Sequence, residues 1–156
     1  MVRKLFILRH GEAESGRNWT DINRPLTDQG KKDVLIVGAK LKSKAIRFDH
    51  VLCSTARRTK ETASLFLEPF TDQPNLTFHE ELYNATLDEV RREIMNIPKD
   101  YTSVVLIGHN PSVSSLATYL LNTQFISLSP GQWMAFDLSI EDWKDLYKGC
   151  GTLFEI

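Results

Sequence analysis

The stretch KLFILRHGEAES (residues 4–15) joins the pattern of a buried strand to chemically active side chains. A short apolar run leads directly into Arg9 and His10, a cation and a titratable ring. Such groups are costly inside an apolar core unless they are paired. The stretch therefore predicts a strand over residues 3–8 that emerges from the core at its C-terminal end and presents Arg9 and His10 to a crevice.

The bulk composition is that of an ordinary globular protein, and 156 residues suit one domain covering residues 1–156. A net charge of -1 gives no general attraction to nucleic acid or membranes, so any attraction for an anion must be local. Two cysteines, Cys53 and Cys150, are too few for a secreted disulfide framework. The segment from Met1 to Leu8 is too short for the apolar region of a signal peptide. No apolar run reaches the ~18 residues of a membrane span. We expect a cytoplasmic location.

Apolar runs of strand length alternate with stretches of helical period along the chain, which is typical of a mainly parallel sheet with helices on its faces. The expected fold class is therefore α/β, a three-layer sandwich. Two late strands should pair antiparallel at a sheet edge. The expected strands cover residues 3–8, 50–53, 76–78, 103–107, 132–138 and 151–156, and the expected helices cover residues 27–45, 55–66, 86–97 and 112–121.

Two of these strands end in a histidine. His10 follows the first strand, and Gly108 and His109 follow the strand over residues 103–107. In open α/β sheets, ligands bind at the carboxyl ends of the strands. We expect both histidines at that edge.

A third strand leads into Arg57 and Arg58 at the start of a helix. Cations there oppose the helix dipole, which costs up to about 1 kcal/mol at exposed sites, and a bound anion would reverse that cost. Arginine offers a fixed fork of donors suited to phosphate. We therefore expect Arg9 and Arg58 to join the two histidines around one tetrahedral anion, with Arg57 as a solvated or rim residue.

Three blocks in this order resemble the signatures of the histidine phosphatase superfamily, which includes phosphoglycerate mutases and acid phosphatases. They are RHGEAE (9–14), STARRTKETA (54–63) and GHNP (108–111). The short chain, with DINRPLTDQG (21–30) and the closing WKDLYKGCGTLFEI (143–156), is most similar to the compact SixA-type phosphohistidine phosphatases. The resemblance spans nearly the whole chain and implies a mixed sheet flanked by helices.

The resemblance also implies roles for individual residues. His10 would be the nucleophile that forms a phosphohistidine intermediate, while Arg9 and Arg58 hold the phosphoryl oxygens and His109 stabilises the transferring charge. Gly11 is expected to leave room beside the nucleophile and to let its backbone carbonyl fix the ring tautomer.

Arg24 is a further candidate for anion binding, and the alternative is that it pairs with Asp21 or Asp28 across the loop. Asp21 itself is interpreted as structural. His50 and His79 lie outside every block and are interpreted as ordinary polar residues.

One departure from the family pattern concerns the proton donor. Phosphomonoesterases of the superfamily usually carry an acid after the third strand, but alignment of FHEELYNATLDE (78–89) puts Asn84 in that place, as a substrate contact without an acidic proton. Glu80 and Glu81 are displaced from it. An imidazole leaving group has a conjugate-acid pKa of about 6.5 and needs less protonation than an alkoxide. The sequence therefore favours a substrate with an N–P bond, and the alternatives are a slow enzyme or a substrate that supplies its own proton.

The expected function is a phosphatase that removes phosphate from phosphohistidine on a protein. The alternatives are a small-molecule phosphomonoesterase using Glu80, Glu81 or another acid, and a non-catalytic phosphate-sensing or phosphocarrier module. No His/Cys/Asp cluster shows metal-ligand spacing, so we expect a metal-independent site without cofactors. The expected partner is a phosphorylated protein or small molecule, with no nucleic acid and no membrane, and the chain as a monomer or weak dimer.

Overall fold

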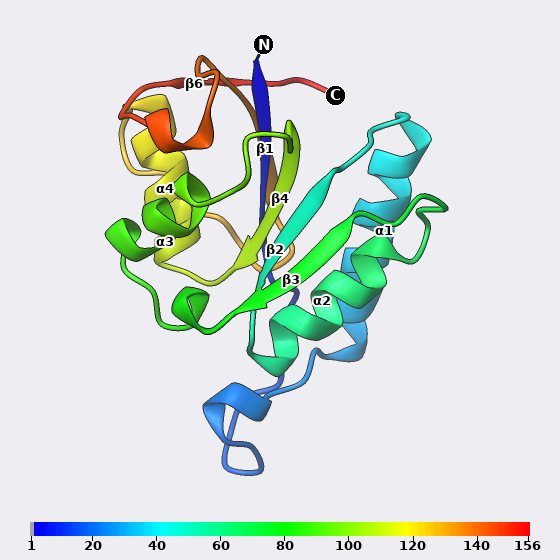
Figure 1. Ribbon diagram of the computed structural model, residues 1–156. Coiled ribbons are helices and arrows are strands. Elements are labelled where there is room, and N and C mark those ends of the chain that lie inside the picture. The colour runs from blue at the N-terminus through cyan, green and yellow to red at the C-terminus, as the bar shows by residue number, and fades with distance from the viewer. Residues whose placement is uncertain (1) are drawn as a thin grey trace.

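The computed structural model describes residues 2–156 and contains one six-stranded sheet in the order β3-β2-β4-β1-β5-β6 (Figure 1). Strands β1 to β4 run parallel to one another, whereas β5 runs antiparallel to β1 and β6 antiparallel to β5. The antiparallel edge expected from the sequence is confirmed. The strands are β1 (Arg3–Arg9), β2 (His50–Ser54), β3 (Asn75–His79), β4 (Ser103–Gly108), β5 (Trp133–Leu138) and β6 (Gly151–Leu153).

Two helices cover each face of the sheet. Helices α1 and α2 pack together on one face and α3 and α4 on the other, which confirms the three-layer α/β sandwich (Figure 1). None of the helices within residues 2–156 combines the length and apolarity needed to cross a membrane. The helices are α1 (Asp28–Ser43), α2 (Arg57–Leu67), α3 (Leu87–Met95) and α4 (Ser112–Leu121), with short 3-10 turns η1 (Asp21–Asn23), η2 (Glu80–Leu82) and η3 (Trp143–Asp145).

Local sequence signals set the starts of two helices. The Thr27 side chain accepts a hydrogen bond from the Gly30 backbone N–H at 3.0 Å and so caps α1. Thr86 and Glu89 form the reciprocal capping box of α3 that the sequence predicts. Both caps satisfy backbone donors that a helix start otherwise leaves without a partner.

The central strands are apolar because both of their faces are covered. In β1, Leu5 and Ile7 pack toward α3 and α4, whereas Phe6 and Leu8 pack toward α1 and α2. Side chains alternate between the two faces of a strand, so a strand buried on both sides reads as an unbroken apolar run.

The register of β1 and β4 brings two polar segments together at one edge. Arg9 pairs with Gly108, and the His10 backbone N–H donates to the Gly108 carbonyl at 3.1 Å. His10 and His109 therefore follow paired residues on adjacent central strands. The loop that contains η1 projects from this same edge, below the sheet in Figure 1.

Most element boundaries agree with the sequence-based expectation within two residues. The final strand differs, because β6 ends at Leu153, whereas the expected strand runs to residue 156. Only three residues of β6 pair with β5, and β6 has no partner on its other side.

Candidate active site

His10 lies just beyond β1 and is 7% exposed. Its Nδ1 atom is 2.7 Å from the Gly11 carbonyl oxygen. Because a carbonyl only accepts hydrogen bonds, Nδ1 carries the proton and Nε2 keeps its lone pair. Burial lowers the pKa of His10 to about 4, with smaller contributions from the charges of Arg58 and Arg9 and against the opposing effect of the Gly11 hydrogen bond. The ring is therefore neutral at pH 7, and a neutral imidazole with a free lone pair can act as a nucleophile.

His109 lies just beyond β4, with its ring centroid 5.3 Å from that of His10. Its Nε2 atom is 2.8 Å from the Ser54 hydroxyl, whereas its buried Nδ1 atom has no partner among residues 2–156. Burial, and then the charge of Arg58, lowers the pKa of His109 to about 3. A buried ring nitrogen without a partner is costly, and a hydrogen-bonding ligand would satisfy it.

Two arginines face the histidines from different elements. Arg9 ends β1 and donates from Nη1 to the Leu128 carbonyl at 3.0 Å. Arg58, the second residue of α2, is 5% exposed and donates from Nη1 to the Asp21 carbonyl at 2.7 Å. The buried Nε groups of both arginines have no partner within the described chain. Burial, and then the charge of Arg58, lowers the pKa of Arg9, so an anion between the two would offset their mutual repulsion.

These four side chains line one cavity of about 250 Å³ at the carboxyl edge of the sheet. The structure thus brings together Arg9, His10, Arg58 and His109, as the sequence predicts, and adds Arg24 to them. Fixed donors that converge on one cavity can bind a tetrahedral anion and stabilise charge that develops on it. The remaining lining residues are Glu12, Ala13, Asn110 and Pro130.

Asp21 connects the two outer arginines of the cavity. Its carboxylate lies 3.3 Å from Nη2 of Arg58 and 3.2 Å from Nε of Arg24. Arg24 therefore does both things that the sequence leaves open: it lines the cavity and pairs with Asp21. Asp21 begins the short 3-10 turn η1, and three residues are too few for hydrophobic periodicity to point to it.

Tyr83 contacts both Asp21 and His109. Its hydroxyl donates to the Asp21 carboxylate, and its ring lies edge-on to the His109 ring at 5.7 Å between centroids. This hydrogen bond is the main reason that the pKa of Asp21 is lowered, with Arg58 and Arg24 adding to it. Asp21 is therefore ionised at neutral pH and holds no proton to give to a leaving group. Tyr83 is a site residue that the sequence analysis missed.

Gly11 does not line the cavity, and one expectation about it is wrong. A Cβ atom there would lie 2.9 Å from the Val34 side chain and 3.0 Å from the Gly30 carbonyl oxygen. The missing side chain makes room for α1 and not for the ring of His10. The Gly11 carbonyl does contact the ring of His10, as expected.

The segment after β3 contributes no carboxyl group to the cavity. Asn84 is exposed with a φ of 52°, and neither it nor the exposed Glu80 and Glu81 lines the cavity. Glu12 does line the cavity, and the sequence analysis did not single it out although it follows the RHG triplet directly. Arg57 lies outside the cavity, where it pairs with Glu61 at 3.1 Å.

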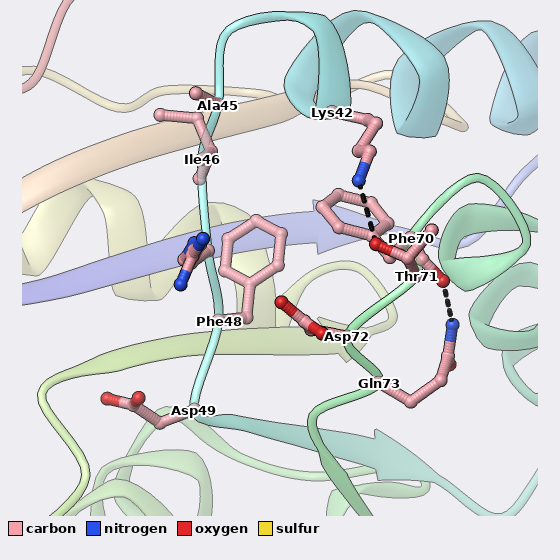
Figure 2. A pocket seen from close by; sticks show the side chains of 10 residues that line it. Lys42, Ala45, Ile46, Phe48, Asp49, Phe70, Thr71, Asp72 and Gln73 are labelled. Carbon is pink, nitrogen blue, oxygen red and sulfur yellow. Dashed lines mark hydrogen bonds between the residues drawn. The ribbon is translucent and has the colours of Figure 1, made fainter.

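A larger cavity, of about 460 Å³, lies near the start of β2 and is a weaker candidate (Figure 2). Phe48 and Phe70 face it, and Lys42 donates to the Thr71 hydroxyl at 3.2 Å. No histidine lines this cavity, and its two cations, Lys42 and Arg47, are matched by two aspartates, Asp49 and Asp72. It offers volume, but no excess of positive charge that would favour an anion.

Comparisons with known proteins agree with this geometry. A chain of Mycobacterium tuberculosis without an assigned function is 27% identical over 155 residues, covering 94% of this chain and 96% of its own. The SixA protein of Nakamurella multipartitia superposes with a TM-score of 0.86 at 25% identity over 99% of this chain and 95% of its own. The protein histidine phosphatase SixA complexed with tungstate has the same fold, with a TM-score of 0.82 at 22% identity over 97% and 94% of the two chains.

The family model described as the histidine phosphatase superfamily (branch 1) matches residues 5–89, which is more than half of the sequence. That range includes Arg9, His10 and Arg58 and extends past Tyr83. The chain belongs to the histidine phosphatase superfamily.

Proposed function

We propose that this protein is a phosphohistidine phosphatase that transfers the phosphoryl group of its substrate to His10 and then to water. In the first step, Nε2 of His10 attacks phosphorus, and the N–P bond of the substrate breaks with its electron pair returning to the leaving imidazole. In the second step, water attacks phosphorus, the bond to Nε2 breaks, and inorganic phosphate leaves. The neutral, oriented ring of His10 supports the first step.

The surrounding cations supply the charge that this reaction needs. Arg9 and Arg58 would bind the nonbridging oxygens, and His109 would donate to the phosphoryl group once a bound anion raises its pKa. Because fixed cations hold the anion, we propose that turnover requires no metal. A chelator such as EDTA should then leave the rate of phosphate release unchanged.

The observation that carries the choice of substrate is that the segment after β3, where phosphomonoesterases of the superfamily usually carry their proton donor, contributes no acid to the cavity. Within residues 80–84, Tyr83 approaches His109, and no acid lines the cavity. Asp21 is held ionised. Imidazole, with a conjugate-acid pKa of about 6.5, leaves without strong acid assistance, whereas an alkoxide does not. This favours phosphohistidine on a protein over a phosphate ester.

Glu12 supports a second candidate, a small-molecule phosphomonoesterase. Glu12 lines the cavity, and its carboxyl group would protonate an alcohol leaving group if the side chain turned toward that group. A general acid contributes roughly 10²- to 10⁴-fold to such a reaction. The two candidate functions therefore differ in what they require of Glu12.

The test compares phosphate release from a phosphohistidine-bearing protein, from phosphoramidate and from p-nitrophenyl phosphate. We expect release from the N–P substrates to be faster and to be kept in Glu12→Gln. If the ester is the faster substrate and its rate falls about 10²-fold or more in Glu12→Gln, the monoesterase function replaces the proposed one.

The same assay separates an enzyme from a phosphocarrier. An enzyme releases many equivalents of phosphate per chain, whereas a carrier retains one equivalent on His10 and stops. Mass spectrometry of the intact chain after mixing with phosphoramidate measures the retained phosphate directly.

A further inference from the structure

Three side chains outside the candidate active site bring metal-binding atoms together. They are His79 at the end of β3, Glu81 in η2 and Glu93 in α3. One atom from each lies within 4.8 Å of the other two, and His79 Nδ1 is 2.9 Å from a carboxylate oxygen of Glu93. The sequence analysis interprets His79 as an ordinary polar residue. It misses the group because the three members come from three different elements.

The charges around the group favour a cation. Two carboxylates face one imidazole, and no lysine or arginine of residues 2–156 pairs with Glu81 or Glu93. The only positive charge that His79 can offer is its own proton. A metal ion in place of that proton would interact with both carboxylates at once, because Glu81 is exposed and its side chain can turn inward.

The far side of the His79 ring is held by a neighbouring strand residue. Its Nε2 atom is 2.7 Å from the Thr77 hydroxyl, which also lies 3.2 Å from Nε2 of His50. If Nε2 donates its proton to Thr77, the lone pair of Nδ1 points at the carboxylates and is available to a metal. Metal-binding histidines are usually fixed by such an outer hydrogen bond.

The surroundings leave room for the rest of a coordination shell. A cavity of about 240 Å³ is lined by His79 and Glu93 together with His50 and Tyr101. Water molecules in this cavity can supply the ligands that three side chains leave open. One imidazole and two carboxylates form a mixed nitrogen and oxygen set, which suits Zn²⁺ better than the all-oxygen preference of Ca²⁺ or Mg²⁺.

We propose that His79, Glu81 and Glu93 bind one divalent ion of the Zn²⁺ type. The ion would join β3, η2 and α3, and it would fix the segment that leads directly to Tyr83. His79 pairs in register with Ser54 of β2, whose hydroxyl contacts His109, so the site lies at the same sheet edge as the candidate active site without sharing a residue with it. The proposal is independent of the substrate proposed above.

Isothermal titration with Zn²⁺ alone tests the proposal on the full chain. We expect one equivalent to bind and to raise the melting temperature, because a ligand that binds only the folded state stabilises it. Glu93→Gln keeps the size of the side chain and should weaken binding by at least about tenfold, and Thr77→Val should weaken it by about 10- to 100-fold through the lost outer hydrogen bond. Glu80→Gln, an exposed neighbour outside the group, is the matched control and should bind as the unaltered chain does.

Zn²⁺ could instead bind the two histidines of the candidate active site. His10→Ala separates these cases, because it should keep full Zn²⁺ binding if the site is at His79. Circular dichroism of each metal-free variant checks that it is folded. The proposal is overturned if the unaltered chain binds no Zn²⁺, if folded Glu93→Gln binds as tightly as the unaltered chain, or if His10→Ala abolishes binding.

Discussion

His10 and His109 lie among arginines, whereas His50 and His79 lie among hydroxyl, amide and carboxylate groups. The first pair has ring centroids 5.3 Å apart, with an unpartnered nitrogen on His109. In the second pair, both rings contact the Thr77 hydroxyl, and the Nδ1 atom of His79 also lies next to the Glu93 carboxylate. His10, His109 and His79 follow or end strands at the carboxyl edge of the parallel sheet, whereas His50 begins β2. The neighbours of the two pairs carry opposite charge.

This difference shows that the neighbours, and not the histidine itself, determine what a site can bind. Arginines at strand ends create a position where a negative ligand relieves repulsion between cations. Carboxylates around an imidazole create a position where a positive ligand relieves repulsion between anions. Substitutions that change one pair and leave the other intact therefore test whether the first pair binds an anion and the second a cation.

The largest expected effect comes from removing the proposed nucleophile, His10. His10→Ala should lower phosphate release by at least about 10⁴-fold, because the covalent route is lost and only anion binding remains. His79→Ala, from the second pair, should keep turnover within a few-fold in the same assay. Appreciable turnover by His10→Ala would show that the covalent step does not occur on this ring.

The next effect concerns the arginines beside the first pair. Arg58→Ala should lower kcat/KM by about 10²- to 10³-fold and weaken vanadate binding, because it removes charge and donors from the transferring group. Arg57→Ala, its exposed neighbour paired with Glu61, should change either quantity by less than about threefold. If Arg57→Ala causes the greater loss, Arg58 is not the anion-binding arginine.

A smaller effect is expected from the hydrogen bond that Tyr83 donates to Asp21. Tyr83→Phe removes about 0.5–1.5 kcal/mol of interaction and should raise KM by roughly 2- to 10-fold, because Asp21 then holds Arg58 and Arg24 less firmly. It should change kcat little, and the pKa of Asp21 should move up toward its ordinary value. Tyr147→Phe, at an exposed site, is the control. A loss confined to kcat would contradict a positioning role.

The smallest expected effect is a shift in the pKa values of His10 and His109. In phosphate-free buffer, histidine NMR signals of His10 and His109 should stay in the neutral form from pH 7.5 to about pH 5.5, because burial lowers their pKa values to about 4 and about 3. Adding tungstate should raise both values, since a nearby anion favours the charged ring. Midpoints near the ordinary value of about 6.5 without an anion would show that the rings are not buried among cations.

The same shifts set a stability trend. The unfolded chain binds protons on these rings below about pH 6.5, whereas the folded chain binds them only near pH 4 and below. The free energy of unfolding should therefore fall as the pH falls from 6.5 toward 4. His109→Asn should flatten this dependence, and thermal unfolding measured at several pH values checks it.

The sequence predicts the layers of the fold well because its signals are local. The unbroken apolar runs of β1 and β4 and the capping box of Thr86 and Glu89 each lie within a few residues. The convergence of Arg9, His10, Arg58 and His109 follows from one rule about strand ends. The roles of these residues in catalysis stay predictions until the variants above are measured.

Other features depend on contacts that no local pattern contains. Tyr83 meets Asp21 across 62 positions of the chain, and Glu93 meets His79 between a helix and a strand. The space at Gly11 is taken by α1, which only the packed structure reveals. Side chains in loops have no periodicity, so their partners emerge only with the tertiary fold.

The pairing of Arg9 with Gly108 has a consequence for heat resistance. His10 and His109 are attached to the two most central strands, whose hydrogen bonds open only when the whole sheet opens. The spacing of the two rings should survive local fraying of the outer strands β3 and β6. Loss of activity on warming should then coincide with global unfolding of the chain and should not precede it.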